Sequence, residues 1–239
     1  MPVHSLLLLA LTLSAGPSAP PSPRRATPEV HALVARCVEA YGGSKAVVRM
    51  ARIREEGTVT SEVLHGGAAG RLVRAYQRSG RLRVEIAYPG SPPEVRVLDG
   101  GRGWRFGEEV HGPLLASMIL QAARLDLPSL LAAWEDRIVD GGALEHEGKR
   151  LRVLALEVGP GLRIEAGIDP GTGRILRSRG VGVGAMPLEF VTRYSDFRTV
   201  DGVLVAFREG NFANGRSTGE TVLEKVELPG ALPDGTFRP

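Results

Sequence analysis

The chain has 239 residues, of which 43% are hydrophobic and 24% charged, a composition that lets a globular protein bury a core without metals or disulfide bonds. Its formal net charge of +3 comes mostly from arginines, which alternate with glutamates as in Arg81 to Glu85. A nucleic-acid-binding surface would cluster such residues and interleave aromatics, so the pattern argues against a nucleic-acid partner and favours a sheet with one solvated face.

An export signal is predicted at the N-terminus. Residues 5–15 read SLLLLALTLSA and are followed by a stretch rich in proline and serine. The apolar run is too short for a transmembrane helix, and no other segment approaches about 20 apolar residues. We therefore expect residues 1–26 to be a signal peptide with a Pro/Ser-rich linker, and residues 27–239 to form a single domain. No cysteine follows the apolar run closely, so no lipid anchor is expected.

A first helix is predicted over residues 28–41. Thr27 offers an N-cap, a proline follows in the first turn, and apolar residues recur at helical spacing until Gly42 and Gly43. Ser44 is expected to cap a second, short helical turn. Cys37, the only cysteine, falls on the apolar face of the first helix, so we expect a buried small hydrophobe rather than a reactive thiol.

From residue 53 the period of the sequence changes to two, which is typical of strands with one buried face. Turn residues such as Ser79-Gly80 and Asp99-Gly100-Gly101 separate the segments. Short links of this kind make neighbouring strands antiparallel. Strands are predicted at about 53–64, 70–77, 81–88, 93–99 and 103–107.

An apolar helical segment interrupts the strands over residues 114–125. Pro128 is expected to break it before a further turn that carries Leu131 and Trp134. The segment is unusually apolar for a surface helix, so it should lie against or inside something hydrophobic. More strands are predicted afterwards, at about 137–139, 143–146, 150–158, 162–168, 174–180, 188–197, 203–209 and 217–228.

So many strands with few helices predict a mainly β fold with some α structure. A long antiparallel sheet must curl, and its concave side is the surface that the apolar helices can cover. The predicted fold class is therefore an α+β protein in which a strongly curved antiparallel sheet packs helices on its concave side.

Motifs for catalysis and for metal binding are missing from the sequence. The histidines of the mature chain, His31, His65, His111 and His146, are far apart in sequence. The glycine-rich stretch 180–184 lacks the strand-then-helix setting of a phosphate loop, and we interpret it as a place where another backbone or a ligand comes close. The acid pairs Glu55-Glu56 and Glu108-Glu109 would point to opposite faces of a strand and are interpreted as solvated charges. No catalytic residue, metal site or cofactor is predicted.

Large apolar side chains on the predicted strands and on the 114–134 segment allow two interpretations. They form ordinary core, or they leave part of the concave face unfilled, with the 114–134 segment as a lid over a cavity for acyl chains. The second interpretation predicts a cavity and lid built from Tyr76, Val84, Ile86, Tyr88, Trp104, Phe106, Met118, Ile119, Leu131, Trp134, Leu154, Leu156, Ile164, Phe190 and Tyr194.

Several segments resemble the superfamily of periplasmic lipoprotein carriers and outer-membrane lipoprotein receptors, the LolA/LolB-like proteins. They are Tyr41-Gly42-Gly43 after the first helix, the apolar central helix, the hairpin from Ile168 to Leu176, and the stretch from Tyr194 to Val203. The resemblance covers nearly all of the mature chain. It implies an open half-barrel of about eleven antiparallel strands, capped by helices over an apolar cavity, without a metal or nucleotide.

The resemblance also implies a function, namely that of a soluble periplasmic carrier that holds the acyl chains of lipoproteins or other lipids. Its partners would be loading and unloading proteins at the inner and outer membranes, and the protein would be a monomer with at most peripheral membrane contact. In the family carrier a strand arginine closes the lid through hydrogen bonds to helix backbone, and Arg71, Arg74, Arg81 and Arg83 lie in the corresponding region.

Two other functions remain open from the sequence alone. The first alternative is a regulatory protein that senses envelope components on the same fold. The second is a hydrolase with a site assembled from dispersed histidines and acids.

Overall fold

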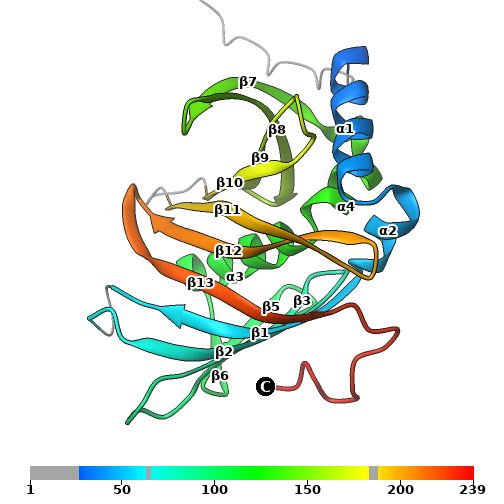
Figure 1. Ribbon diagram of the computed structural model, residues 1–239. Helices are drawn as coiled ribbons and strands as arrows, with labels where there is room; N and C mark the ends of the chain where they lie inside the picture. Colours follow the sequence, from blue (N-terminus) through cyan, green and yellow to red (C-terminus); the bar gives the residue numbers. More distant parts are fainter. Residues whose placement is uncertain (1–26, 63–65, 183–187) are drawn as a thin grey trace, which may run out of the picture.

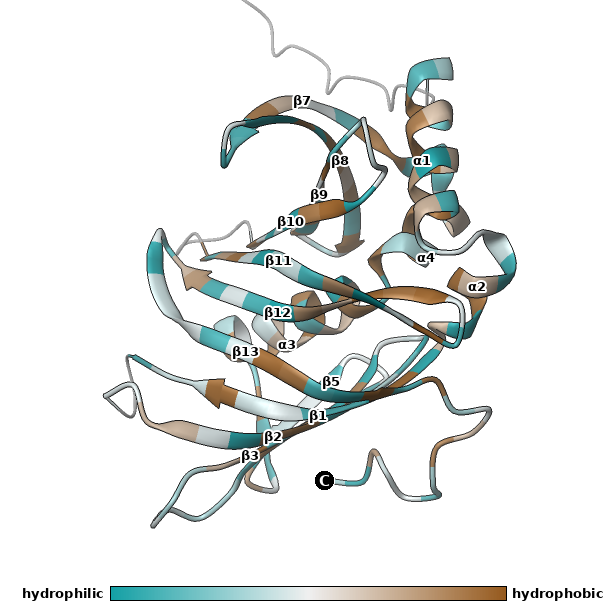
Figure 2. Cartoon of the chain, in the orientation of Figure 1, coloured by the Kyte–Doolittle hydropathy of each residue, from teal (hydrophilic) through white to brown (hydrophobic). Residues whose placement is uncertain are grey.

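The computed structural model describes residues 27–62, 66–182 and 188–239, so the predicted signal peptide lies outside the described residues. Alternating hydrophobic residues give the strands one face to bury, and the alternation is visible along the sheet in Figure 2. The strands before the central helices are β1 (Arg52–Thr60), β2 (Ala69–Gln77), β3 (Arg81–Ala87), β4 (Glu94–Asp99), β5 (Arg102–Arg105) and β6 (Glu108–Val110). The later strands are β7 (Val139–His146), β8 (Lys149–Gly159), β9 (Leu162–Ile168), β10 (Ile175–Gly182), β11 (Leu188–Val200), β12 (Val203–Ala213) and β13 (Arg216–Glu227).

All 13 strands of the described chain join one antiparallel sheet with the order β6-β5-β4-β3-β2-β1-β13-β12-β11-β10-β9-β8-β7. Pairing of β1 with β13 connects a first arm, β1 to β6, to a second arm, β7 to β13. The sheet curves but does not close, so the fold is the predicted α+β half-barrel (Figure 1).

The described sheet has 13 strands against the about eleven that the resemblance implied, and it has as many strands as the sequence predicted segment by segment because two differences offset each other. Residues 108–110, which were not predicted as a strand, pair with β5 as the edge strand β6. Residues 137–139 and 143–146, predicted as separate strands, belong largely to one strand, β7, whose register shifts between Asp140 and Ala143. This irregularity contains two glycines, which lower strand propensity and explain the predicted interruption.

Helix α1 (Pro28–Ala40) begins as predicted, because the Thr27 side chain accepts a hydrogen bond from the Val30 backbone N–H at 3.4 Å. The N-cap of α2 (Ser44–Arg49) is Gly43 and not Ser44. Its φ of 84° lies in the left-handed region that favours glycine, which is why the cap falls one residue earlier than expected. Cys37 is fully buried on α1, and burial raises the pKa of its thiol to about 12.

Helix α3 (Gly112–Leu125) runs through the interior of the curved sheet. It contacts β8, β9 and β10 of the second arm and β3 and β5 of the first arm. The chain then bends by 79° at Asp126 into α4 (Leu127–Ala133), which packs on α1 and is followed by the short 3-10 helix Glu135–Arg137. Among the described residues no single helix has the length and apolar character to span a membrane, although α3 and α4 together pass that test as a bent pair.

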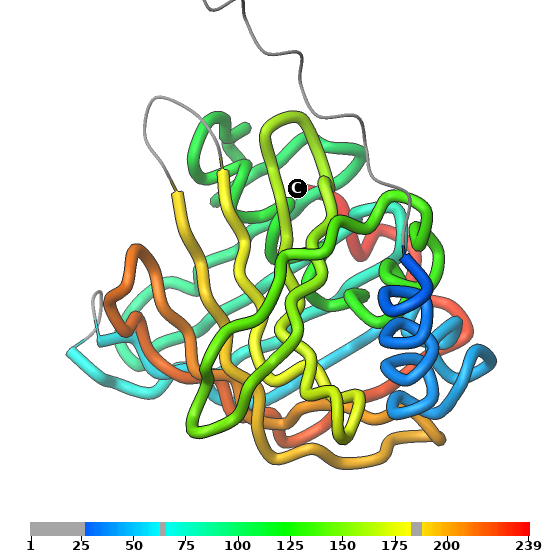
Figure 3. Tube along the Cα trace, turned by 90° about the horizontal axis from the view of Figure 1, so that it is seen from above, coloured from blue at the N-terminus to red at the C-terminus, as the bar shows by residue number. Residues whose placement is uncertain are grey.

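Two clusters of buried side chains hold the helices to the concave face. One joins α1 and α4 to β8, β9 and β10, and the other joins α3 to β1 to β4 and the neighbouring β12 and β13. Helix α1 stands at one end of the sheet, away from the tips of β10 and β11 (Figure 3). The C-terminal segment follows the opposite, convex face, where the Arg83 side chain donates a hydrogen bond to the Arg238 carbonyl at 3.0 Å.

Candidate functional site

A cavity of about 710 Å³ opens beside α3 and α4, and we call it the apolar cavity. It lies among the β2–β3, β4–β5 and β8–β9 turns, so both arms of the sheet contribute to its rim. Its volume falls within the range of about 300–1,000 Å³ that is typical of small-molecule pockets. Most of its wall is apolar and includes Tyr76, Leu98, Ile119, Ala122, Ala123, Leu130, Ala133, Trp134, Val158, Pro160 and Leu162.

Three side chains predicted for the cavity line this wall, namely Tyr76, Ile119 and Trp134. They come from β2, α3 and the residue that ends α4. The helical segment that the sequence singled out as a lid therefore forms one wall of the cavity.

The corner between α3 and α4 is fastened to the sheet by Asp126. Its carboxylate accepts hydrogen bonds from Arg78 Nε at 2.6 Å, Arg78 Nη2 at 2.9 Å and the Tyr76 hydroxyl at 3.2 Å. Arg78 also donates to Ser129 Oγ at 2.6 Å and to the Val47 carbonyl at 3.4 Å. Burial raises the pKa of Asp126 above its usual value, although the Arg78 guanidinium opposes that shift. One arginine thus links the β2–β3 turn to three helices.

The sequence did not single out Arg78. It lies just after β2, in a turn, so the alternation of strand residues carries no information about where its side chain points. Of the arginines that were considered, Arg71, Arg81 and Arg83 pair with acids on the convex face, at Glu56, Asp99 and Glu85. Only Arg74 points into the sheet's concave side, where it is almost fully buried.

A second cavity of about 240 Å³ lies on the other side of α3, and we call it the polar cavity. Ser117, Gln121 and Arg124 of α3 face it, whereas Ile119 and Ala123 face the apolar cavity, as expected for opposite sides of one helix. Predicted residues Val84, Ile86, Ile164 and Phe190 line the polar cavity. Further polar groups on its wall are Arg74, Arg96, Ser178, Thr192, Asn211, Thr218 and Thr221.

A buried network of charges sits at the floor of the polar cavity. Arg74 Nε donates to Glu55, and its two terminal nitrogens donate to Glu209 at 2.9 and 3.2 Å. Arg124 Nη2 donates to the same Glu209 carboxylate at 3.1 Å. Burial alone would raise the pKa of Glu209, but Arg124 and Arg74 outweigh it and lower the pKa to about 2. The network connects β1, β2, α3 and β12.

Glu55 corrects one prediction from the sequence. Glu55 and Glu56 do point to opposite faces, but only Glu56 is a solvated charge, paired with Arg54 and Arg71. Glu55 is only 3% exposed because its strand neighbour Arg74 pairs with it inside the sheet.

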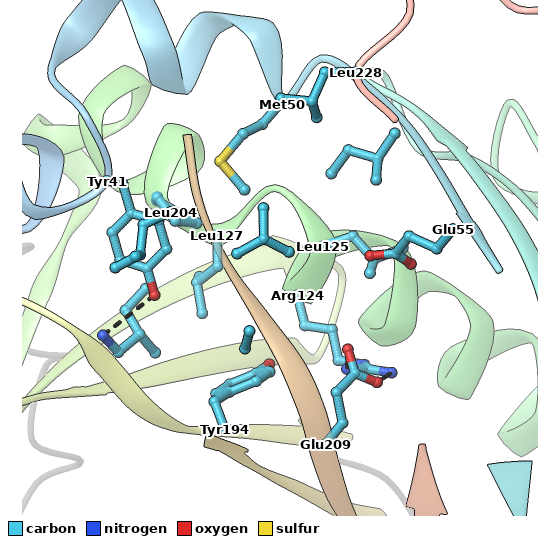
Figure 4. A pocket seen from close by; sticks show the side chains of 15 residues that line it. Tyr41, Met50, Glu55, Arg124, Leu125, Leu127, Tyr194, Leu204, Glu209 and Leu228 are labelled. Carbon is cyan, nitrogen blue, oxygen red and sulfur yellow. Dashed lines mark hydrogen bonds and ion pairs between the residues drawn. The ribbon is translucent and has the colours of Figure 1, made fainter. Parts of the chain in front are cut away.

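A third and smaller space of about 60 Å³ lies between the charge network and α2. Figure 4 shows Arg124, Glu209 and Glu55 gathered at one end, with Met50, Leu125 and Leu204 near the other. Predicted residue Tyr194 lines this space, and its hydroxyl lies 2.7 Å from Ser178 Oγ. This space is too small for an acyl chain.

Four predicted cavity residues are ordinary core instead. Met118, Leu131, Leu154 and Leu156 are each at most 1% exposed and belong to the two buried clusters. Tyr88 is half-buried and its ring covers Gly70, where an added Cβ would come within 2.8 Å of the ring.

Two aromatic residues predicted for the concave face lie elsewhere. Trp104 pairs with Val97 and Gly103 with Leu98, and it is Gly103 that faces Leu115 and Met118 of α3. Trp104 therefore points to the convex side, where Arg102 lies over its ring at 5.1 Å. Phe106 is 59% exposed in the turn after β5. The helix approaches β5 over a glycine, so the small residue and not the aromatic one marks the inner face.

In the described part of the glycine-rich stretch a helix side chain comes close, rather than another backbone or a ligand as interpreted from the sequence. Gly180 on β10 lies under Leu120 of α3, and an added Cβ would come within 3.1 Å of that side chain. Residues 183 and 184 of the stretch lie outside the described residues.

The described histidines His31 and His146 each lie beside a single glutamate. His31 lies 2.6 Å from Glu135, and His146 lies 3.9 Å from Glu147, while His65 is outside the described residues. Within the described ranges no three histidine, cysteine, aspartate or glutamate side chains form a group that could hold a metal ion.

Comparisons with known proteins bear on the fold. No family model matches the chain, and no curated protein matches it in sequence. Among solved structures, a LolA superfamily protein from Nitrosomonas europaea aligns with a TM-score of 0.54 and 14% identity, over 81% of this chain and 96% of that chain. A DUF1329 family protein from Desulfovibrio piger aligns with a TM-score of 0.52 and 11% identity, over 88% of this chain and 98% of that chain. The chain therefore has a LolA-like fold, as the sequence resemblance implied.

Proposed function

We propose that this protein is a periplasmic carrier of lipids or lipoproteins that holds acyl chains in the apolar cavity. The observation that carries the proposal is the cavity of about 710 Å³ with an apolar wall, left open between α3, α4 and the rims of both sheet arms. Binding of an acyl chain in such a cavity is favoured mainly by the burial of hydrocarbon, which contributes about 0.8 kcal/mol for each methylene group.

The position of the cavity supports reversible binding. Its rim is made of turns and of α4, so an acyl chain can enter from the side without breaking the pairing of strands. The contact of Asp126 with Arg78 holds the α3–α4 corner against β2, and its release would allow that corner to move. The Arg78 side chain is 36% exposed, so a ligand or partner can reach the contact.

Export and fold are compatible with this role. The apolar N-terminal run predicts passage across the inner membrane, and the LolA superfamily protein from Nitrosomonas europaea shares the half-barrel. We further propose that partner proteins at the inner and outer membranes load the acyl chains into the cavity and unload them from it.

The proposal is tested by filling the cavity from its rim. Ala133 and Ala132 are neighbours on α4 and both are exposed, but only Ala133 is among the residues that line the cavity. We expect A133W to lower the affinity for a fluorescent long-chain fatty acid at least tenfold, because the indole occupies the space of the hydrocarbon. The matched control A132W should bind as the wild type does.

Displacement by unlabelled palmitate separates cavity binding from adsorption of the dye. The wild type should release the dye to palmitate with a stoichiometry of about one. Equal dye binding by A133W and A132W, or a wild type that takes up no dye, would contradict the proposed function.

A further inference from the structure

The polar cavity holds more positive than negative charge. Strand pairing places Arg74, Val84, Arg96 and Arg105 in one row on the concave face. With Arg124 from α3, four arginines lie in and beside this cavity. Among the described residues, three acids pair with these arginines, namely Glu55, Glu94 and Glu209. Four arginines against three carboxylates leave one positive charge without a matching acid.

Arg96 is the arginine with the weakest pairing. Its Nε lies 3.5 Å from Glu94 Oε1, but the same oxygen lies closer, at 2.9 Å, to Arg105 Nε. Arg96 Nε has no hydrogen-bond partner among the described residues, although that atom is buried. Burial, together with Arg105 and Arg74, lowers the pKa of Arg96 below that of a free arginine. The Arg96 side chain is 20% exposed, and a guanidinium whose Nε is buried without a partner favours an added anion.

Arg124 offers a second donor at the same cavity. Its Nη1 is 3.1 Å from Glu209 Oε1, yet this atom also lacks a hydrogen bond of acceptable geometry within the described part of the chain. Both guanidinium groups line the cavity, together with Gln121 and Ser117 of α3. The neutral Gln121 amide can donate a further hydrogen bond to an oxyanion without adding charge, whereas the Ser117 hydroxyl already donates to the Leu114 carbonyl at 2.7 Å.

The remaining wall limits the size and nature of such an anion. Val84, Ile86, Leu120 and Phe190 give the cavity an apolar side, so a short hydrocarbon stem fits beside the charged group. The volume of about 240 Å³ is below the range of about 300–1,000 Å³ found for drug-sized ligands. A medium-chain carboxylate combines an anionic group for the arginines with a hydrocarbon stem that is short enough for this volume.

We propose that the polar cavity is a second binding site, which takes a singly charged carboxylate on a short apolar stem through Arg96 and Arg124. The site shares no lining residue with the apolar cavity and is separated from it by α3. It therefore goes beyond the proposed carrier function and does not depend on it.

The test is isothermal titration of the full mature chain with octanoate, 1-octanol and octylammonium, which differ only in the charge of the head group. Wild type should bind octanoate at least tenfold more tightly than 1-octanol and should not bind octylammonium. The R96Q variant should lose at least tenfold in octanoate affinity, because a charge-assisted hydrogen bond is removed. The control R102Q changes an arginine whose side chain is 65% exposed and should bind octanoate as wild type does.

The R96K variant distinguishes the loss of the positive charge from a general disturbance of the fold. Lysine keeps the positive charge, so R96K should retain a preference for octanoate over 1-octanol that R96Q has lost. Equal octanoate affinity in R96Q and wild type, or equal affinity of wild type for octanoate and 1-octanol, would overturn the proposal. A wild type that shows the Arg96-dependent preference but takes up no long-chain dye would contradict the carrier function and support this second site.

Discussion

The two sides of helix α3 present opposite chemistry to the interior of the same sheet. On one side, Ile119 and Ala123 face a large apolar space that no side chain fills. On the other, Arg124 joins Arg74 and Glu209 in a buried charge network beneath a smaller cavity. Buried charge pairing and open space are therefore divided between these two regions. The charge network ties both arms to the helix, and the apolar side leaves a cavity open.

The largest expected effect comes from breaking the charge network. R74L leaves Glu55 and Glu209 buried without their shared partner, which should lower the free energy of unfolding by about 3–5 kcal/mol. The control R71L removes a surface arginine whose side chain is 68% exposed and should cost at most about 1 kcal/mol. Urea denaturation of both variants measures the difference. Similar midpoints for R74L and R71L would show that the network does not hold the arms together.

A fall in pH should change the stability contributions of the two regions with opposite signs. Glu209 has a folded pKa of about 2 against an ordinary value of 4.5, so its contribution is complete above pH 4.5 and is lost as the pH falls toward 2. At about 1.36 kcal/mol per pKa unit the loss is on the order of 3 kcal/mol. Asp126 has the reverse sign, because its raised pKa makes the folded state bind a proton more readily as the pH falls.

Urea denaturation from pH 7 to pH 3 resolves the contribution of Glu209. The wild type should lose stability over the acidic part of this range, and E209Q should show a flatter dependence on pH because it has no carboxylate to protonate. If the two proteins have parallel pH profiles, Glu209 is not held as an ion in the folded state.

Much of the fold could be predicted from the sequence because it rests on local patterns. The Thr27 cap, the helical spacing of α1 and the alternation along β3 each depend on a few neighbouring residues. The half-barrel also followed from the sequence, through the number of strands and the resemblance. The strand β6 was missed because a three-residue edge strand carries too short a pattern.

The site was predicted only in part, since it depends on pairing between distant segments. Arg74 and Glu55 have the same alternating context as the surface arginines and glutamates, and only their neighbours across the sheet bury them. Trp104 was placed on the wrong face because Gly103, which receives α3, gives no hydrophobic signal. Arg78 was missed because it sits in a turn. In each case the deciding contact comes from a residue far along the chain.

The central claim is that acyl chains enter the apolar cavity, and the only two tryptophans of the chain allow a direct measurement. Trp134 lines that cavity, whereas Trp104 lies on the convex face. Titration with a brominated stearic acid should therefore quench the fluorescence of W104F, in which Trp134 remains, and leave that of W134F almost unchanged. Quenching confined to W134F, or equal quenching of the two variants, would contradict the account.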